Sequence, residues 1–251
     1  MKLRWAILLA GFALAGLTAL AGPAAAQELS LDLGQGADGE TTQRLIQIVV
    51  LVTILSLAPS ILVMVTSFTR IVVVLSFLRN ALGIQQTPPN SVLISLALFL
   101  TAYIMMPTMQ AVYDQALQPL INDRMTTTTA LEEASGPVRS FMLDHVREQD
   151  LTLFLDMANV ENVENAEDTP LRALVPAFMI SELRRAFEIG FLLYLPFLII
   201  DMVVASVLMS MGMLMLPPVI ISLPFKLIFF VLVDGWYLVA GSLVRSYGIG
   251  G

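Results

Sequence analysis

The stretch FLLYLPFLIIDMVVASVLMSMGMLMLPPVIISLPFKLIFFVLV, residues 191–233, decides the fold of this chain. Between Asp201 and Lys226 it holds 24 residues without a charge. One helix of that length would reach about 36 Å, which exceeds the ~30 Å apolar core of a bilayer. The Pro217–Pro218 pair interrupts the run, because each proline removes a backbone donor and clashes with the preceding turn. The sequence therefore predicts two helices that meet near Gly212 to Pro218.

Methionines alternate through this meeting point, within the sequence SMGMLMLPP. Their unbranched, polarizable side chains can fill an irregular opening in many conformations. We therefore predict a deformable plug, with ordinary core filling as the alternative. The residues of the predicted plug are Met209, Met211, Met213, Leu214 and Met215.

Charges inside this apolar stretch are costly and are expected to be paired or to line a wet cavity. Asp201 lies 14 residues before Met215 and Lys226 lies 11 after it. In a hairpin the two charges would lie within about 5 Å of equal depth, which predicts an ion pair between them. Two alternatives stay open: Lys226 pairs with Glu182 of a neighbouring chain, or Glu182 pairs with Arg185 on a helix surface. A structural role is predicted for all three charges, with proton relay in a solute or proton transporter as the rival.

The composition is that of a membrane protein. The chain has 251 residues, of which 57% are hydrophobic and 13% charged, and its mean hydropathy is +0.82. Its formal net charge is -7, and 14 of its 20 carboxylates lie between Asp114 and Glu188, beside six arginines. That acidic segment has an ordinary soluble composition, and helical periodicity recurs within it.

The N-terminal residues resemble a secretory signal peptide. Lys2 and Arg4 precede an apolar run, and the small residues before Gln27 suggest cleavage after Ala26, with an uncleaved membrane anchor as the alternative. The last helix is expected to run from about Val219 to Arg245. The predicted divisions are a signal peptide (1–26), a flexible periplasmic lead-in (27–44), a first pair of apolar helices (45–112), an acidic helical periplasmic region (113–188) and a second apolar hairpin (189–251).

Two arginines and two phenylalanines are further candidates for contacts. Arg70 and Arg79 lie nine residues apart and face roughly opposite sides of a valine- and leucine-rich helix, which suggests burial among subunits; cytoplasmic anchoring is the alternative. In the acidic segment, Phe141 and Phe154 are predicted either to anchor subunit contacts or to form a small helical core.

Several kinds of chemistry are not indicated. Cysteine is absent, which excludes disulfides and thiolate chemistry. The single histidine, His145, is expected to be solvated, because a metal site needs more ligands and catalysis needs a placed nucleophile. No phosphate-binding glycine loop and no basic patch with interleaved aromatics occurs. We therefore expect no enzyme activity, cofactor, metal or nucleic-acid partner.

Five stretches of the sequence resemble the FliP family, the export-gate membrane proteins of the bacterial flagellar type III secretion apparatus. They are TSFTRIVVVLSFLRNALG, QQTPPN, SLALFLT, PAFMISEL and IDMVVASVLMSMGMLMLPPVIISLPFKLIFFVLVDGW. The resemblance covers nearly all of the chain after the predicted signal peptide. One departure is Leu214, where the family usually has a further methionine.

The resemblance implies an all-α membrane protein whose helical hairpins assemble into a ring, pentameric by analogy, together with FliQ-like and FliR-like subunits. Such a ring would conduct unfolded flagellar export substrates across the bacterial inner membrane at the flagellar basal body. It would stand largely on the periplasmic side of the bilayer, which conflicts with a simple count of apolar spans. The methionine-rich turn would then seal the pore.

Overall fold

The computed structural model describes residues 38–84, 86–160, 168–213 and 215–248. The predicted signal peptide lies outside these residues, as does Leu214. The chain divides into two units, residues 1–55 and 56–251. Helix α2 (Asp38–Met64) belongs partly to each, and it includes the end of the predicted lead-in (27–44) and the start of the predicted first pair of apolar helices (45–112). The second unit carries the remaining helices.

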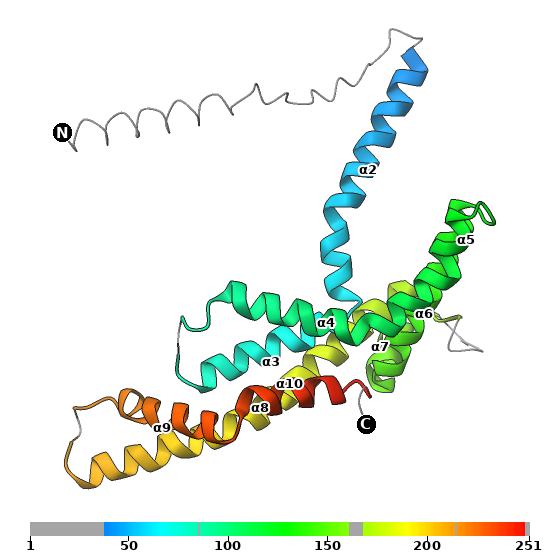
Figure 1. The fold of residues 1–251 in the computed structure, drawn as a ribbon. Coiled ribbons are helices and arrows are strands. Elements are labelled where there is room, and N and C mark those ends of the chain that lie inside the picture. The colour runs from blue at the N-terminus through cyan, green and yellow to red at the C-terminus, as the bar shows by residue number, and fades with distance from the viewer. Residues whose placement is uncertain (1–37, 85, 161–167, 214, 249–251) are drawn as a thin grey trace, which may run out of the picture. The chain divides into compact units, whose positions relative to one another are not determined.

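The described part of the second unit consists of helices, without a strand, which confirms the predicted all-α class (Figure 1). A π-helical turn, η1, continues α4 directly. The elements are α3 (Phe68–Ala81), α4 (Asn90–Val112), η1 (Tyr113–Leu117), α5 (Gln118–Ile121), α6 (Thr127–His145), α7 (Glu148–Met157), α8 (Leu171–Ser210), α9 (Pro218–Leu232) and α10 (Gly235–Arg245).

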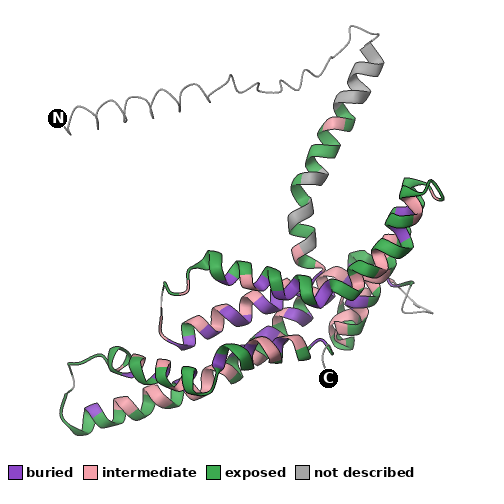
Figure 2. Cartoon of the chain, in the orientation of Figure 1, coloured by how far each residue is buried: buried purple, intermediate pink, exposed green. Residues whose placement is uncertain are grey.

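Helix α3 is the centre of the unit. It packs mainly against α8 and α4, and its buried residues Ile71, Val74, Leu75 and Leu78 follow the spacing of one helical face. Figure 2 shows this concentration of buried positions along α3, whereas α9 is largely exposed. Burial of this helix was predicted among subunits, and in the structure α4 and α8 of the same chain already cover its buried face.

The break predicted in the apolar stretch is confirmed. Helix α8 ends at Ser210, and α9 begins at Pro218. Gly212 adopts a φ of 75°, a left-handed conformation that suits glycine. Proline at the first position of α9 needs no amide donor there, so the same residues that stop one helix start the next.

The prediction of one last helix from Val219 to Arg245 is wrong, because a bend of 62° separates α9 from α10. Asp234 adopts a left-handed conformation at the bend. A Cβ at Gly235 would lie 2.1 Å from Cε2 of Phe230, so only glycine allows this close approach. The Asp234–Gly235 dipeptide is a turn signal that the apolar pattern around it concealed.

The two longer helices that lie wholly within the acidic segment, α6 and α7, both pack against α8. Val146 is extended and separates α6 from α7, and α7 packs against α8. Helix α8 is continuous through Pro176 and Pro196, so it crosses the predicted boundary between residues 188 and 189. The acidic region and the second hairpin therefore share one helix.

Among the described residues, two helical segments are long and apolar enough to cross a membrane: residues 90–121 and α8. The bent pair α9 and α10 passes the same test if it is counted as one span. These segments agree with the membrane class predicted from composition.

Candidate functional site: two ion pairs and a methionine turn

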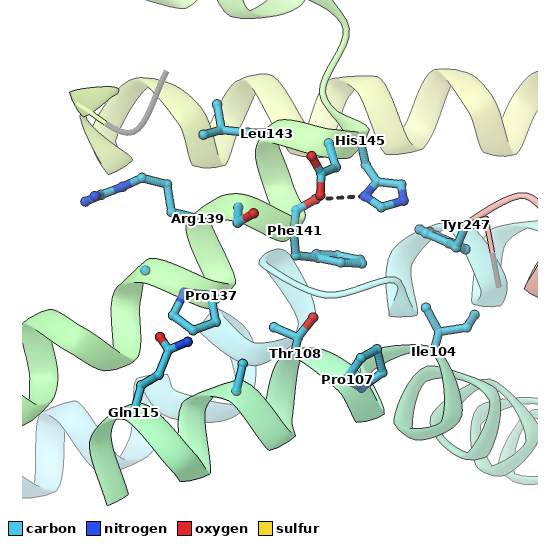
Figure 3. Close-up of a pocket in the computed structure, with 14 residues that line it drawn as sticks. Ile104, Pro107, Thr108, Gln115, Pro137, Arg139, Phe141, Leu143, His145 and Tyr247 are labelled. Atoms are coloured by element: carbon cyan, nitrogen blue, oxygen red, sulfur yellow. Dashed lines mark hydrogen bonds between the residues drawn. The ribbon is translucent and has the colours of Figure 1, made fainter. Parts of the chain in front are cut away.

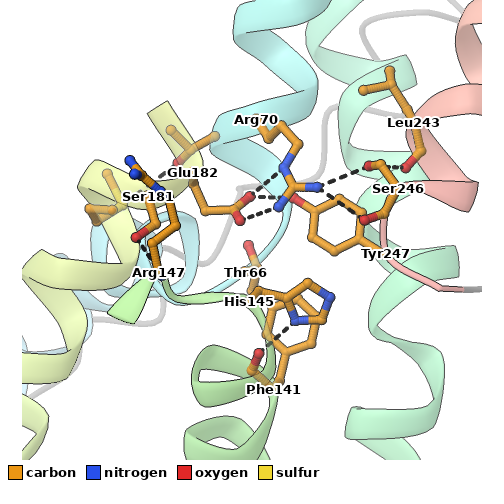
Figure 4. Close-up of polar contacts among 12 residues, drawn as sticks. Thr66, Arg70, Phe141, His145, Arg147, Ser181, Glu182, Leu243, Ser246 and Tyr247 are labelled. Atoms are coloured by element: carbon orange, nitrogen blue, oxygen red, sulfur yellow. Dashed lines mark hydrogen bonds and ion pairs between the residues drawn. The ribbon is translucent and has the colours of Figure 1, made fainter. Parts of the chain in front are cut away.

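A buried ion pair joins α3 to the N-terminal half of α8. Arg70 on α3 and Glu182 on α8 have side chains that are 1% and 0% exposed. Arg70 Nε donates to Glu182 Oε2 at 2.9 Å, and its Nη2 donates to Oε1, so the contact is bidentate (Figure 4). Such fork-like pairing fixes the orientation of both groups. In the structure Glu182 is thus held by Arg70 rather than by Arg185, the surface partner considered from sequence.

Residues after α10 complete this pair. Tyr247 donates its hydroxyl proton to Glu182 Oε2, and the Arg70 guanidinium carbon lies 3.8 Å from the centre of the Tyr247 ring. Arg70 Nη1 also donates to Ser246 Oγ at 2.9 Å. Burial raises the pKa of Tyr247, and the adjacent Glu182 carboxylate raises it further, so the phenol stays a proton donor. The buried charges are therefore surrounded by hydrogen-bond and cation–π partners.

Aromatic rings extend the cluster into α6. The Phe141 ring is stacked 6.0 Å from Tyr247 and meets Phe178 edge-on at 5.9 Å. His145 lies beside both rings, 4.6 Å from Phe141 and 5.0 Å from Tyr247. Its Nδ1 is 2.7 Å from the Phe141 carbonyl oxygen. The expectation of a solvated His145 holds in part: the residue is half-buried, because its ring packs against Phe141 and Tyr247.

The rings of Phe141, His145 and Tyr247 form one wall of an open cavity of about 800 Å³ between α4, η1 and α6 (Figure 3). Its lining mixes apolar and polar groups, among them Ile104, Pro107, Phe141, Arg139 and Tyr247. Phe154, the second phenylalanine predicted to make assembly contacts, lies on α7 and is half-buried. Phe141 thus contributes to a core within the chain, the alternative considered for both residues.

A second ion pair lies toward the other end of α8. Lys226 Nζ on α9 donates to Asp201 Oδ2 at 2.6 Å and to the Ala81 carbonyl at the end of α3 at 3.1 Å. Asp201 Oδ1 accepts from Ser222 Oγ at 2.5 Å. Lys226 is nearly fully buried, whereas 24% of the Asp201 side chain is exposed. Within one chain, Lys226 is thus paired across the hairpin as the equal-depth argument predicts.

The methionine turn has no such cover. Met209, Met211 and Met213 are exposed, and Met215 is 98% exposed. The turn bonds back to the end of α8, with the Met213 amide 3.0 Å from the Leu208 carbonyl. Within the described part of the chain, these thioethers are not core filling, which was the alternative considered for them.

Arg79 holds the loop between α3 and α4. Its Nη1 donates to Asn90 Oδ1 at 2.5 Å and to the Pro88 carbonyl at 3.4 Å. Arg70 and Arg79 therefore differ: one is sealed in the core and the other is partly exposed at a turn. Their predicted intersubunit roles stay predictions, because the contacts seen are within the chain.

Sequence reasoning missed the polar residues that complete both pairs. Ser222 lies four residues before Lys226, a spacing that places both on one side of α9 and that gave a usable signal. Ser246 and Tyr247 gave none, since they follow a helix of ordinary amphipathic pattern. Over the described residues, no cluster of three or more histidine or acidic side chains is arranged to hold a metal ion.

Comparison with known proteins agrees with the family predicted from sequence. A sequence model of the FliP family matches residues 51–243. The flagellar biosynthetic protein FliP of Caulobacter vibrioides is 62% identical over 234 residues, covering 91% of this chain and 87% of that protein. The FliP proteins of Bacillus subtilis and Aquifex aeolicus are 52% and 53% identical, covering 86% and 80% of this chain and 98% and 85% of their own lengths. The chain therefore belongs to the FliP family of flagellar biosynthetic proteins.

Proposed function

We propose that this chain is a pore-forming subunit of the flagellar type III protein export gate. Copies of it would assemble into a ring in the bacterial inner membrane, with FliQ-like and FliR-like subunits, and would conduct unfolded flagellar substrates. Family membership supports the flagellar role. The exposed methionine turn at the tip of a long apolar hairpin is the observation that carries the pore proposal.

The turn has the properties of a gasket. Its thioethers are apolar, so a ring of them would exclude ions and water. Each has several rotatable bonds, so the ring could adapt to the varied side chains of a passing polypeptide. Gly212 and the proline-bounded start of α9 hold the turn between two helices without a covering element. The stiffer Leu214 would keep the apolar seal.

Ring formation would also account for apolar surface that one chain leaves uncovered. Helix α8 exposes Phe191, Leu192, Met202 and Val203, and α9 exposes Ile220, Phe225 and Val231. Apolar faces of this extent are covered by lipid or by other subunits. Helix α8 can be covered by both lipid and other subunits if its two ends have different surroundings. The acidic helices pack at its N-terminal part, and α9 packs at its C-terminal part.

The transporter alternative has weaker support. Glu182 and Asp201 lie on the same helix and are 19 residues apart, which corresponds to about 28 Å along its axis. A proton relay over that length requires intervening groups that exchange protons. Between them α8 carries two arginines, which stay protonated, an exposed Glu188 paired with Arg184, and Tyr194. The two pairs are better placed as separate structural clamps.

Deletion of Met213–Met215 tests the gasket. We expect the deleted chain to enter the membrane and assemble, while cells that express it become permeable to small ions. Met215→Ala should give a smaller leak in the same assay. Met157→Ala, which removes an exposed methionine from α7, is the matched control and should give none. An unchanged ion barrier in the deleted ring would count against the pore proposal.

A further inference from the structure

The residues that follow α10 have a place in the core that the family match does not explain. The FliP family model ends at residue 243. Ser246 and Tyr247 lie beyond it, yet Tyr247 is 6% exposed and contacts α3, α6 and α8 through Arg70, Phe141 and Glu182. A residue outside the matched range therefore joins three helices within it.

Tyr247 makes its contacts with two different parts of its side chain. The hydroxyl donates to Glu182, and the ring lies against Arg70, Phe141 and His145. Without the ring, Phe141 and His145 would lose a stacked partner and border the open cavity directly. Without the hydroxyl, Glu182 would keep the Arg70 pair and lose one hydrogen bond.

Ser246 adds a polar contact on the other side of Arg70. Its Oγ accepts from Arg70 Nη1 at 2.9 Å, and its hydroxyl donates to the Leu243 carbonyl at 2.7 Å. The Ser246 amide continues the backbone bonding of α10 with the Ser242 carbonyl at 2.9 Å. The orientation of Arg70 is thereby coupled to the docking of α10, since Leu243 on that helix is 1% exposed.

We propose that Ser246 and Tyr247 form a latch that holds α10 against Arg70, Phe141 and Glu182 and so keeps the chain in the conformation that assembles. The proposal rests on the proposed function, in which copies of the chain form a ring. Tyr247 acts through Arg70, Phe141 and Glu182, so it is a positioning residue. An undocked latch would leave Phe141 and His145 mobile at the cavity wall and α10 loosened, while the other helices keep their own packing.

The latch can be tested with a single introduced thiol, because the chain contains no cysteine. Leu243→Cys places the thiol on the buried side of α10. The full chain would be extracted in detergent from cells that express the whole flagellar export gate. Maleimide labelling then reports the docking of α10, and the mass of the purified particle reports ring assembly. Both readouts are independent of export, so failure of the latch is distinguishable from failure of the pore proposal.

Three variants separate the parts of the latch. Tyr247→Leu removes both the aromatic ring and the hydroxyl. We expect maleimide labelling of the thiol to accelerate at least roughly tenfold, and we expect the assembled subunit rings to be lost. Tyr247→Phe keeps the aromatic contacts, so most of the assembled subunit rings should be retained. Its Leu243→Cys thiol should be labelled at an intermediate rate. Tyr237→Leu, at a residue of α10 that is 69% exposed, is the matched control and should match the parent chain. Circular dichroism confirms that each variant retains its helices.

Two results would overturn the proposal. The first is a protected thiol in Tyr247→Leu, which would show that α10 docks without the latch. The second is a full-size ring in Tyr247→Leu, which would show that assembly does not depend on it. If Tyr247→Phe and Tyr247→Leu lost assembled subunit rings equally, the effect would be due to the hydroxyl hydrogen bond. That result would overturn the role of the Tyr247 aromatic ring in positioning Phe141.

Discussion

Asp201 and Lys226 are unequally buried, so removing one should cost more than removing the other. Asp201→Leu leaves the Lys226 ammonium group, whose side chain is 3% exposed, without its counter-ion. Breaking a buried pair in this way costs about 3–5 kcal/mol of unfolding free energy. Lys226→Met leaves Asp201, which is 24% exposed and keeps the Ser222 hydrogen bond. Its cost should be about 1.5–3 kcal/mol, that of lost charged hydrogen bonds.

Replacing both charges together should cost less than Asp201→Leu alone. The double variant, Asp201→Leu with Lys226→Met, leaves neither charge buried, and its side chains suit an apolar surrounding. If the pair is structural, flagellar export should also be largely retained in the double variant. A proton relay through these residues would instead lose transport completely.

Tryptophan fluorescence provides the assay. The chain has two tryptophans, so a Trp5→Phe background leaves Trp236 as the single reporter. Its ring meets Phe230 edge-on at 5.4 Å beside the bend between α9 and α10, and it changes surroundings when the hairpin unfolds. Denaturant titration of the detergent-solubilised protein then gives the unfolding free energy of each variant.

An exposed pair on the same helix is the control. Arg184 and Glu188 are 56% and 60% exposed at the i, i+4 spacing, so Glu188→Gln should change the unfolding free energy by about 0–1 kcal/mol. Equal costs for Asp201→Leu and Lys226→Met would refute the reasoning from unequal burial. So would a double variant whose cost equals the sum of the two single costs.

Two further predictions use the same unfolding assay. Gly235→Ala should lower the unfolding free energy by about 1–3 kcal/mol, because its Cβ would lie 2.1 Å from Phe230 and force a rearrangement. Gly136→Ala lies inside α6, where the added Cβ would meet no atom within 4 Å apart from its chain neighbours and its own helix. It should change the unfolding free energy by less than about 1 kcal/mol, because alanine favours the helix and the following Pro137 opposes a Cβ there; similar behaviour of the two would contradict the packing at the bend. Burial raises the pKa of Tyr247, so its phenol ionises more easily in the unfolded chain; its contribution to stability is complete below about pH 10 and declines as the pH rises further. Tyr247→Phe should reduce this alkaline decline, and an unchanged pH profile would argue against a buried phenol.

The parts of the fold that depend on local signals were predictable. The proline pair and Gly212 located the break between α8 and α9 because they act on the backbone at the positions they occupy. The partner of Lys226 was predictable for a similar reason: a hairpin with a known turn fixes which residues lie at equal depth. The bend at Gly235 was missed because hydropathy there is continuous and gives no boundary.

The Arg70–Glu182 pair was not predictable, because its partners are 112 residues apart and belong to different hairpins. An arginine in a valine-rich helix gives the same pattern whether it anchors at a membrane surface or is buried against a carboxylate. Periodicity placed Arg70 on one face of α3 without showing what lies opposite that face. The role of Tyr247 was hidden for the same reason, since its partners come from three distant helices.

The two ion pairs clamp α8 at separate levels, and this arrangement suits the proposed gate. Arg70 and Glu182 join α8 to α3 near the acidic helices, and Lys226 joins it to α9 and to the end of α3. Beyond Asp201, α8 continues to Ser210 and leads into the exposed turn. If the tip bends, the contacts that change lie beyond the second clamp, on the side of the turn. The first clamp lies on the other side of the second clamp, so it can keep its geometry. A gate that yields to a polypeptide while its ring stays assembled requires this separation between a fixed part and a deformable part.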